Sequence, residues 1–313
     1  MKIVCAQFCP QFKKVQENAD HVKKLVSKIS ADQVDLLVLP EMALTGYVFD
    51  SFDEIEPYLE NPYENMSATF SLLSSISKHL ECYVVAGFPE RASDQTLREF
   101  GPTDIRHDAR HKEEETISNA HLPRIPRKAY NSAMLVGPCG SLIKVFRKHF
   151  LYEVDTTWAD EGPGFEYIEL PRIGRLCVAI CMDLNPYTLD TSFNKYELTS
   201  FCDRNQIDIL VMPMNWLLPE EDIREVNKDL AQPSVPTINY WVARCVPLWV
   251  PGLCQPGHEG HNTFLVASNR TGSENGLTFA GSSSVLQFTL SESANLLGAL
   301  GVDTDGLLHV STT

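Results

Sequence analysis

Three residues of the chain combine a reactive side chain with a position at or directly after the end of an apolar, strand-like run. Glu41 follows the run DLLVLP, Lys148 ends the run SLIKVFRK, and Cys181 ends the run GRLCVAIC. Sites in α/β proteins are commonly built where strands end. A thiol is a nucleophile, and a lysine ammonium beside it can hold an oxyanion or lower the pKa of the thiol. If the fold brings them together, these residues predict the chemistry of a thiol hydrolase.

Each of these residues also has an ordinary structural explanation. Glu41 could be a solvated loop residue, and Lys148 could lay its stem on apolar surface with its ammonium in water. Cys181 could be a buried thiol like Cys177, which lies inside the same run. The turn residues in MDLNPY favour instead an exposed thiol at a strand-to-turn corner. His149, beside Lys148, stays open as a base for this thiol.

The elements around these residues alternate between strands and helices. KIVCAQF and DLLVLP read as strands on either side of a helix whose apolar positions run from Val15 to Ile29. A second helix, with apolar positions from Met66 to Leu80, precedes the strand CYVVAGF. This alternation is typical of a layered α/β protein.

From residue 130 onward, closely spaced strands predict hairpins, which pair AYNSAMLVG with SLIKVFRK and FEYIEL with GRLCVAIC. A helix is predicted at roughly 192 to 205, followed by the strand IDILVMP and an acidic helix in PEEDIREVNKDL. The C-terminal third predicts further strands in HNTFLVASN, GLTF, SSVLQFTL and LLGALGVD.

Residues 91 to 129 are polar and charged, and they have almost no periodic apolar positions. We interpret them as a surface insertion in a single domain that spans residues 1–313. Long segments of this kind are usually functional or disordered, so a mobile flap and an inert insertion both stay open.

Composition excludes some classes of function. The chain has 313 residues, 43% of them hydrophobic, and a formal charge of -15 that comes from 41 acidic and 26 basic residues. This charge opposes binding to a phosphate backbone, so we expect no nucleic-acid partner. No run of 18 apolar residues exists, and the start MKIVCAQF lacks the pattern of a secretory signal. We therefore expect no membrane association and a cytoplasmic location, and an additional nuclear share stays open.

The nine cysteines are an odd number, and several lie inside apolar runs, which suggests a reducing compartment. No C-x2-C pair exists, and the spacing fits no zinc pattern. We expect neither a metal nor a cofactor, although soft ligands could in principle come from Cys177, Cys181, Cys202, Cys245, Cys254, His258 and His261.

The order of the three motifs resembles that of the nitrilase superfamily. The matching segments are LVLPEMALTGY, YNSAMLVGPCGSLIKVFRKHF and GRLCVAICMDLNPY, and NYWVARC and FLVASNRTGSENGLTFAGSSSV also fit. The resemblance implies that Glu41, Lys148 and Cys181 are catalytic and that the fold is a four-layer α-β-β-α sandwich. Periodicity alone would also allow a doubly wound sheet.

Within the superfamily, CMDLNPY, RKHFLYEVDTTWADEGPGF and MNWL are most similar to the fungal N-terminal amidases. These enzymes deamidate Asn or Gln at a protein's N-terminus and so feed an N-degron pathway. Many other members have C-Y-D-x-R-F-P, where this chain has Asn185 and Pro186. The alternatives are a small-molecule amidase, ω-amidase, carbamoylase or nitrilase, and a catalytically inactive binding module on the same fold.

The resemblance also implies supporting roles. The backbone N–H of Met182 would hold the oxyanion together with Lys148, and Asp155 would be a second carboxylate near the lysine, with Glu153 as the alternative. Asp183 either supports the nucleophile or caps its turn. Protein or peptide N-termini would be the substrates, while the residues that bind them and the oligomeric state stay undetermined.

Overall fold

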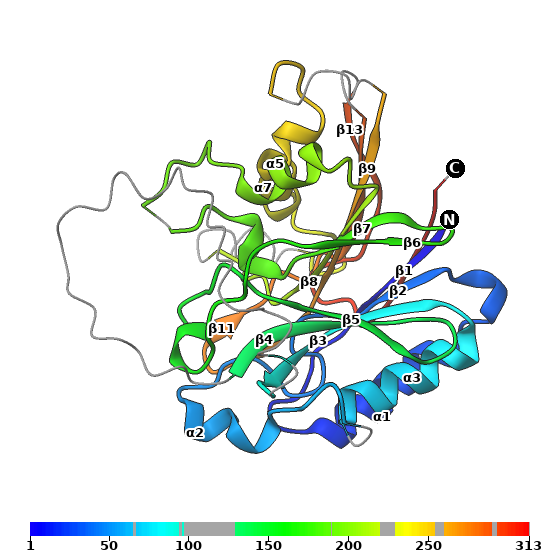
Figure 1. The fold of residues 1–313 in the computed structure, drawn as a ribbon, viewed down its shortest axis with the longest axis vertical. Coiled ribbons are helices and arrows are strands. Elements are labelled where there is room, and N and C mark those ends of the chain that lie inside the picture. Colours follow the sequence, from blue (N-terminus) through cyan, green and yellow to red (C-terminus); the bar gives the residue numbers. More distant parts are fainter. Residues whose placement is uncertain are drawn as a thin grey trace.

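Two six-stranded β-sheets form the centre of the molecule (Figure 1). The computed structural model describes residues 1–64, 67–93, 96, 129–188, 190–219, 229–253, 260–289 and 293–312. Across the first sheet the strands are β14 (Gly306–Ser311), β1 (Lys2–Gln7), β2 (Leu36–Val38), β3 (Tyr83–Arg91), β4 (Ala129–Val136) and β5 (Leu142–Arg147). Across the second sheet they are β13 (Ser293–Ala299), β12 (Ser284–Thr289), β9 (Asn262–Asn269), β8 (Ile209–Met214), β7 (Gly174–Val178) and β6 (Tyr167–Leu170).

The two sheets share one pattern of strand directions. β1, β2 and β3 run parallel in the first sheet, as do β7, β8 and β9 in the second. The remaining pairs are antiparallel, which includes the predicted hairpins β4–β5 and β6–β7. A separate two-stranded ribbon consists of β10 (Ser273–Glu274) and β11 (Leu277–Thr278).

Alternation along the strands divides the core into layers. In β1, Ile3 and Cys5 belong to the apolar cluster between the sheets, whereas Val4 and Ala6 belong to the cluster beneath the helices. Because successive strand side chains point to opposite faces, a continuous apolar run can bury both faces of its sheet.

Helices cover the outer face of each sheet, as Figure 1 shows. α1 (Val15–Val26) and α3 (Ala68–Leu80) pack on the first sheet, and α5 (Glu197–Arg204) and α7 (Val235–Arg244) pack on the second. The layers are therefore α-β-β-α, as predicted. Short helical segments complete the chain, namely α2 (Phe52–Ile55), η1 (Ala31–Gln33), η2 (Glu56–Tyr58), η4 (Asp155–Thr157), η5 (Cys181–Leu184) and η6 (Val246–Leu248).

Some predicted elements differ from the observed ones. The helix expected from about residue 192 begins only at Glu197, because Ser192 and Asn194 form a local turn in which Lys195 N–H donates to the Ser192 carbonyl at 2.9 Å. α7 and β14 were not predicted. The acidic helix expected in PEEDIREVNKDL lies almost wholly outside the described residues. In the part of the chain that the structure describes, no helix is long and apolar enough to cross a membrane.

The insertion predicted at 91 to 129 leaves and re-enters the first sheet at one point. Arg91 ends β3 and Ala129 begins β4, and these two residues are cross-strand partners. Both ends therefore belong to strands, which corrects the predicted bounds and confirms that the flanking strands share one sheet. Most of the insertion lies outside the described residues, and its role and the single-domain assignment stay predictions.

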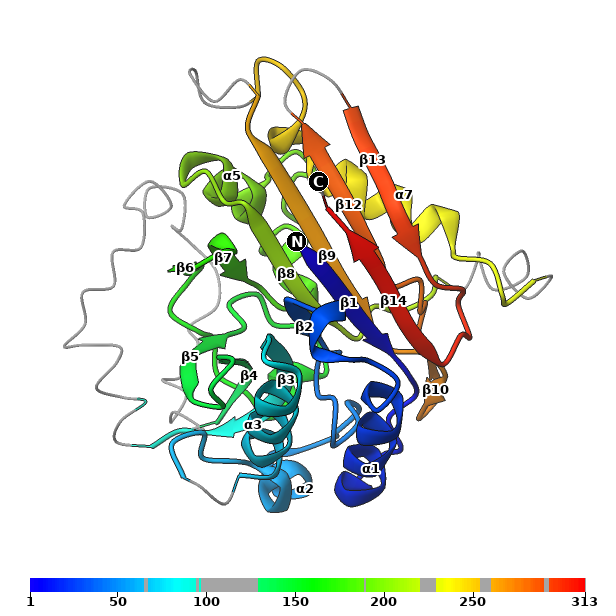
Figure 2. The ribbon, with the colours of Figure 1, turned by 90° about the vertical axis from the view of Figure 1, so that its right-hand side faces the viewer.

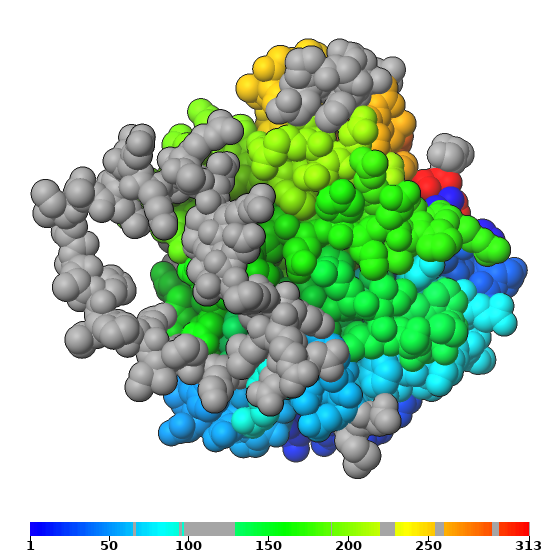
Figure 3. Space-filling model, in the orientation of Figure 1, coloured from blue at the N-terminus to red at the C-terminus, as the bar shows by residue number. Residues whose placement is uncertain are grey.

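The chain ends lie close together, because β1 and β14 pair from Lys2 with Ser311 to Gln7 with Gly306. Figure 2 shows both termini on these neighbouring strands. In the space-filling view, the green segments that carry β4 to β7 lie between the blue and cyan N-terminal part and the yellow and orange part (Figure 3). The segments that carry Lys148 and Cys181 thus lie between the two halves of the molecule.

Candidate active site

A tight turn after β2 carries Glu41 into a fully buried position. The neighbouring Met42 has a φ of 51°, in the left-handed region. The turn lies directly on β3, where a Cβ atom on Gly87 would come within 2.5 Å of the Glu41 Cα atom. Glycine at position 87 therefore allows the close approach that buries the carboxylate.

Lys148 follows β5 and is 1% exposed. Its backbone N–H donates to the Asn131 carbonyl at 2.8 Å, which continues the β4–β5 pairing by one residue. Its Nζ atom donates to Glu41 Oε1 at 2.8 Å and to Asp155 Oδ2 at 2.6 Å. The snorkelling alternative for Lys148 is therefore wrong, because the ammonium lies in the interior between two carboxylates.

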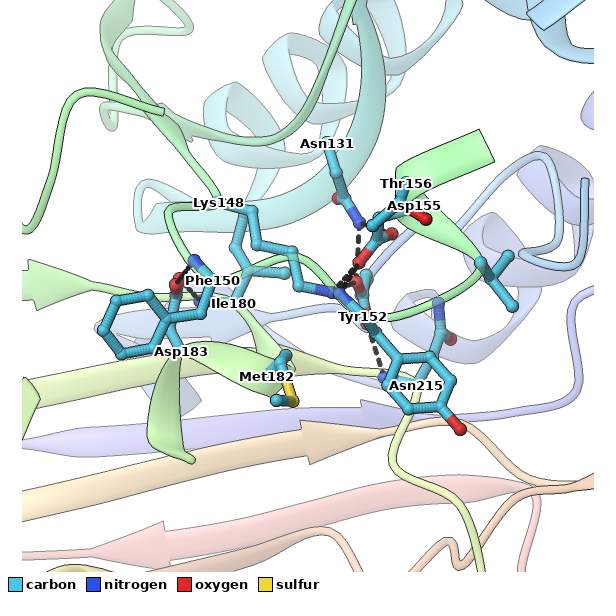
Figure 4. Close-up of polar contacts among 12 residues, drawn as sticks. Asn131, Lys148, Phe150, Tyr152, Asp155, Thr156, Ile180, Met182, Asp183 and Asn215 are labelled. Atoms are coloured by element: carbon cyan, nitrogen blue, oxygen red, sulfur yellow. Dashed lines mark hydrogen bonds and ion pairs between the residues drawn. The ribbon is translucent and has the colours of Figure 1, made fainter. Parts of the chain in front are cut away.

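Asn131 holds these two carboxylates together. Its Nδ2 group donates to Glu41 Oε1 at 2.7 Å and to Asp155 Oδ1 at 2.8 Å, and Figure 4 shows Asp155 between Asn131 and the Lys148 ammonium. Asp155 is fully buried, whereas Glu153 is exposed. Of the two acids proposed as the second carboxylate, the structure thus brings only Asp155 to the lysine.

Cys181 lies at the corner between β7 and η5, as the turn residues predict. Its φ of 45° is unusual for a residue with a side chain, and its exposed fraction is 7%. Strained backbone of this kind is concentrated at functional sites. The thiol is therefore held at a corner by the surrounding structure, although it is more deeply buried than the sequence predicts.

Asp183 fixes this corner to the segment that follows Lys148. Its Oδ2 atom accepts from Ile180 N–H at 2.8 Å, and its Oδ1 atom accepts from the N–H groups of His149 and Phe150 at 3.0 and 2.7 Å (Figure 4). The capping alternative for Asp183 is confirmed. The same contacts tie the thiol-bearing turn to the lysine-bearing strand.

Met182 is the second residue of η5. The first N–H that bonds within this turn belongs to Asp183, which donates to the Ile180 carbonyl at 3.0 Å. The Met182 N–H precedes it, in the position where the amides of a helical turn have no partner within the turn. The role of this N–H as an oxyanion donor stays a prediction.

A third strand end adds Asn215, which sequence reasoning missed. Asn215 directly follows β8, and its backbone N–H donates to Glu41 Oε2 at 2.8 Å. Burial raises the pKa of the Cys181 thiol, and the backbone of Asn215 partly opposes this shift. Asn215 therefore binds Glu41 directly and lies beside the thiol.

Burial and charge set the protonation of the site. Burial raises the pKa of Glu41, and the Lys148 charge opposes this shift. Burial also raises the pKa of the Cys181 thiol, and the Glu41 charge raises it further. Burial alone would lower the pKa of Lys148, but the charges of Asp155 and Glu41 outweigh it and raise that pKa. The resting site therefore holds a charged lysine, a protonated thiol and a carboxylate with increased proton affinity.

His149 is engaged elsewhere. Its Nδ1 atom lies 3.0 Å from the Gly162 carbonyl, and its ring contacts Phe150, Phe165 and Tyr187. The Glu41 charge raises the pKa of the Cys181 thiol, and the role of Glu41 as its base stays a prediction. Among the described residues, no group of three His, Cys, Asp or Glu side chains could hold a metal ion, and the described cysteines are free thiols. Cys254 and His258 lie outside the described residues.

Residues 2–186 match the sequence model of a family described as carbon-nitrogen hydrolase, a range that includes Glu41, Lys148 and Cys181. The chain belongs to the carbon–nitrogen hydrolase family. As such it is a hydrolase that acts on amides. The chain is 30% identical over 322 residues to a protein N-terminal amidase of Schizosaccharomyces pombe (strain 972 / ATCC 24843), and the match covers 98% of each chain.

Solved structures support the fold. Two crystal structures of N-terminal amidase, one with an Asn-Glu-Ala peptide and one with a Gln-Val peptide, align with TM-scores of 0.78 and 0.77. Their sequence identities are 23% and 22%, and each alignment covers 99% of this chain and 96% of the other. The nitrilase-type sandwich is thereby confirmed.

Proposed function

We propose that this carbon–nitrogen hydrolase deamidates an N-terminal Asn or Gln of a peptide or protein to Asp or Glu and releases ammonia. The observation that carries the proposal is the buried group in which the Lys148 ammonium pairs with Glu41 and Asp155, next to the Cys181 corner. The named relatives, one of them crystallised with Asn- and Gln-initiated peptides, give the substrate class.

The first half of the reaction forms a thioester. Glu41 accepts the thiol proton, and the Cys181 sulfur attacks the carboxamide carbon. Lys148 and the Met182 N–H stabilise the oxyanion that develops on the carbonyl oxygen. The C–N bond then breaks, the proton on Glu41 passes to the leaving amine, and ammonia departs.

The second half hydrolyses the thioester. Glu41 takes a proton from a water molecule, whose oxygen attacks the thioester carbon. The C–S bond breaks, the sulfur takes the proton back from Glu41, and the product is a carboxylic acid. Lys148 keeps its charge throughout, because its pKa is raised by Asp155 and Glu41 despite its burial.

The cellular setting is proposed on chemical grounds. The free thiols of the described residues suit a reducing compartment, so the enzyme would act in the cytoplasm or the nucleus. Its products, N-terminal Asp and Glu, would be passed to an N-degron pathway.

A peptide panel tests the proposal. The peptides differ only at residue one, and each is prepared with a free and with an acetylated N-terminus. A small ω-amide such as glutaramate is the control for the small-molecule alternative. We expect mass spectrometry to show conversion of the free Asn and Gln peptides alone. The proposal fails if no free Asn or Gln peptide releases ammonia.

A further inference from the structure

The side chain of Asn215 is an unused primary amide in the interior. Asn215 is 2% exposed, and neither its Oδ1 nor its Nδ2 atom has a hydrogen-bond partner among the described residues. Asn131 differs, because its Nδ2 group already donates to two carboxylates. Burial of an unpaired amide lowers the stability of the protein. An amide in this state therefore indicates that a bound substrate supplies its hydrogen-bond partners.

The backbone of Asn215 is fixed on both sides of this amide. Its own N–H is bound to Glu41, and the next residue, Trp216, is held by the Asn269 side chain. That side chain accepts from Trp216 N–H at 2.8 Å and donates to the Trp216 carbonyl at 3.2 Å. Figure 4 shows Asn215 in the same close-up as Lys148 and Asp155. The free amide thus belongs to the residue whose N–H binds the Glu41 carboxylate of the site.

A substrate with a free N-terminus offers the matching groups. In such a residue the α-ammonium is a donor and the carbonyl oxygen is an acceptor. The ammonium and the carbonyl group are both bonded to the same α-carbon. The carboxamide carbon lies one methylene away from that α-carbon in Asn and two in Gln. When this carbon is at the Cys181 sulfur, the α-carbon therefore lies close to it, within reach of the neighbouring Asn215.

We infer that Asn215 recognises the free N-terminal residue, with Oδ1 accepting a hydrogen bond from the α-ammonium and Nδ2 donating to the carbonyl oxygen of residue one. This inference rests on the proposed function and identifies the side chain that recognises the substrate's N-terminus. An Asn side chain can make both contacts at once, because its amide carries an acceptor and two donor hydrogens side by side.

The charge of the site favours a cation. Glu41 and Asp155 both pair with the single ammonium of Lys148, at 2.8 and 2.6 Å. When both carboxylates are ionised, the three groups together carry a net negative charge. A buried α-ammonium beside them is compensated electrostatically, whereas a neutral acetylated N-terminus gains nothing from this charge.

The test uses two peptides that differ only at the α-amine. One is Asn-Glu-Ala with a free N-terminus, and the other is succinamoyl-Glu-Ala, which has hydrogen in place of the amine. Their kcat/KM values are compared for the wild type, Asn215→Leu and Asn215→Asp. The matched control is Asn185→Leu, because the Asn185 amide is already partnered by Met182 Sδ and the Tyr240 hydroxyl.

We expect Asn215→Leu to lower kcat/KM for the amine peptide by about 10- to 100-fold, since hydrogen bonds to charged groups have about this effect. The des-amino peptide keeps only the contact with the carbonyl oxygen, so its kcat/KM should fall by a clearly smaller factor. Asn215→Asp keeps an acceptor and should keep the preference for the amine. Asn185→Leu should change kcat/KM by the same factor for both peptides. The melting temperature of Asn215→Leu should not fall, because its amide has no partner among the described residues.

Binding separates failure of the inference from failure of the proposed function. If the wild type turns over too little of the des-amino peptide, both peptides are titrated into Cys181→Ser with and without Asn215→Leu, and the same fold-changes in Kd are expected. Equal losses for both peptides in Asn215→Leu, or loss of the amine preference in Asn215→Asp, would overturn the inference while the proposed function stands. If the wild type deamidates neither peptide, the proposed function itself has failed.

Discussion

Arg147 and Lys148 are neighbours in the chain, yet their charges are buried in two very different groups. Because successive side chains of an extended strand point to opposite faces, Arg147 meets Glu90 while Lys148 meets Glu41 and Asp155. The hairpin partner strand repeats this division, with Ser132 beside Arg147 and Asn131 beside Lys148.

The Arg147 group is balanced. The guanidinium donates to both Glu90 oxygens at 2.8 Å, and the hydroxyls of Ser132 and Thr96 donate to the same carboxylate at 2.6 and 2.9 Å. In the pair of Arg147 and Glu90, one positive charge meets one negative charge in the two-pronged geometry that arginine favours. Such a group stabilises a structure and has no further chemistry to offer.

The Lys148 group is unbalanced. Two carboxylates share one ammonium, a thiol lies beside them, and the Asn215 amide has no partner among the described residues. Burial of charged groups alone therefore does not identify a functional site. Unequal charge and unused hydrogen-bonding groups distinguish the site from its structural neighbour.

Replacing a carboxylate in each group should reveal the largest difference between the two groups. Glu41→Gln removes the base and should lower kcat/KM for an Asn-initiated peptide by about 10²- to 10⁴-fold. Glu90→Gln should instead lower the free energy of unfolding, because it leaves Arg147 with a weakened partner, and folded enzyme should stay active. Ammonia release and urea unfolding measure the two effects. Full activity in Glu41→Gln would remove Glu41 from the reaction.

Replacing the cation gives the next largest contrast. Lys148→Met removes an oxyanion donor and should lower kcat by about 10²- to 10³-fold. Arg147→Met leaves Glu90 buried without its cation and should cost about 3–5 kcal/mol of stability. The same two assays apply. An inactive but fully stable Arg147→Met protein would contradict the division between the two groups.

Replacing the neutral partner should have a smaller effect. Asn131→Leu removes the donor shared by Glu41 and Asp155 and should lower kcat/KM by about 10- to 100-fold. Ser132→Ala, on the other face of the same strand, should leave kcat/KM unchanged. If both variants reduce activity equally, Asn131 has no special role in holding the carboxylates.

The pH profile should show the smallest effect. Burial raises the pKa of Glu41 above its ordinary value of 4.5, while Lys148 and Asn131 oppose the shift. Protonated Glu41 cannot accept the thiol proton, so kcat/KM should fall with decreasing pH, with a midpoint above 4.5. Asn131→Leu should move this midpoint to higher pH, and Ser132→Ala should not. A midpoint that moves to lower pH in Asn131→Leu would contradict this explanation.

The sequence allowed prediction of the residues that follow strand ends, because apolar runs reveal where strands stop. Glu41, Lys148 and Cys181 were found this way, and the layers followed from the alternation of strands and helices together with the family resemblance. Asn215 obeys the same rule, since it directly follows the run ILVMPM, but a single Asn after a strand has no chemical signature of its own.

Other features depend on the three-dimensional arrangement. Asn131 lies inside β4, and only the register with β5 shows that it reaches the Lys148 side of the sheet. α7 was missed because its Val, Ile, Thr and aromatic residues have low helix propensity. Its start is fixed instead by Ser234, whose side chain accepts from the Thr237 N–H, and by a proline in its first turn.

The nucleophile provides the most direct test. Ammonia release from an Asn-initiated peptide is measured for the wild type, for Cys181→Ala and for Cys139→Ser, whose thiol is exposed in the turn between β4 and β5. We predict that the wild type and Cys139→Ser release ammonia at equal rates, while Cys181→Ala is at least about 10³-fold slower and still folded. A folded Cys181→Ala protein with undiminished ammonia release would contradict the assignment of this site.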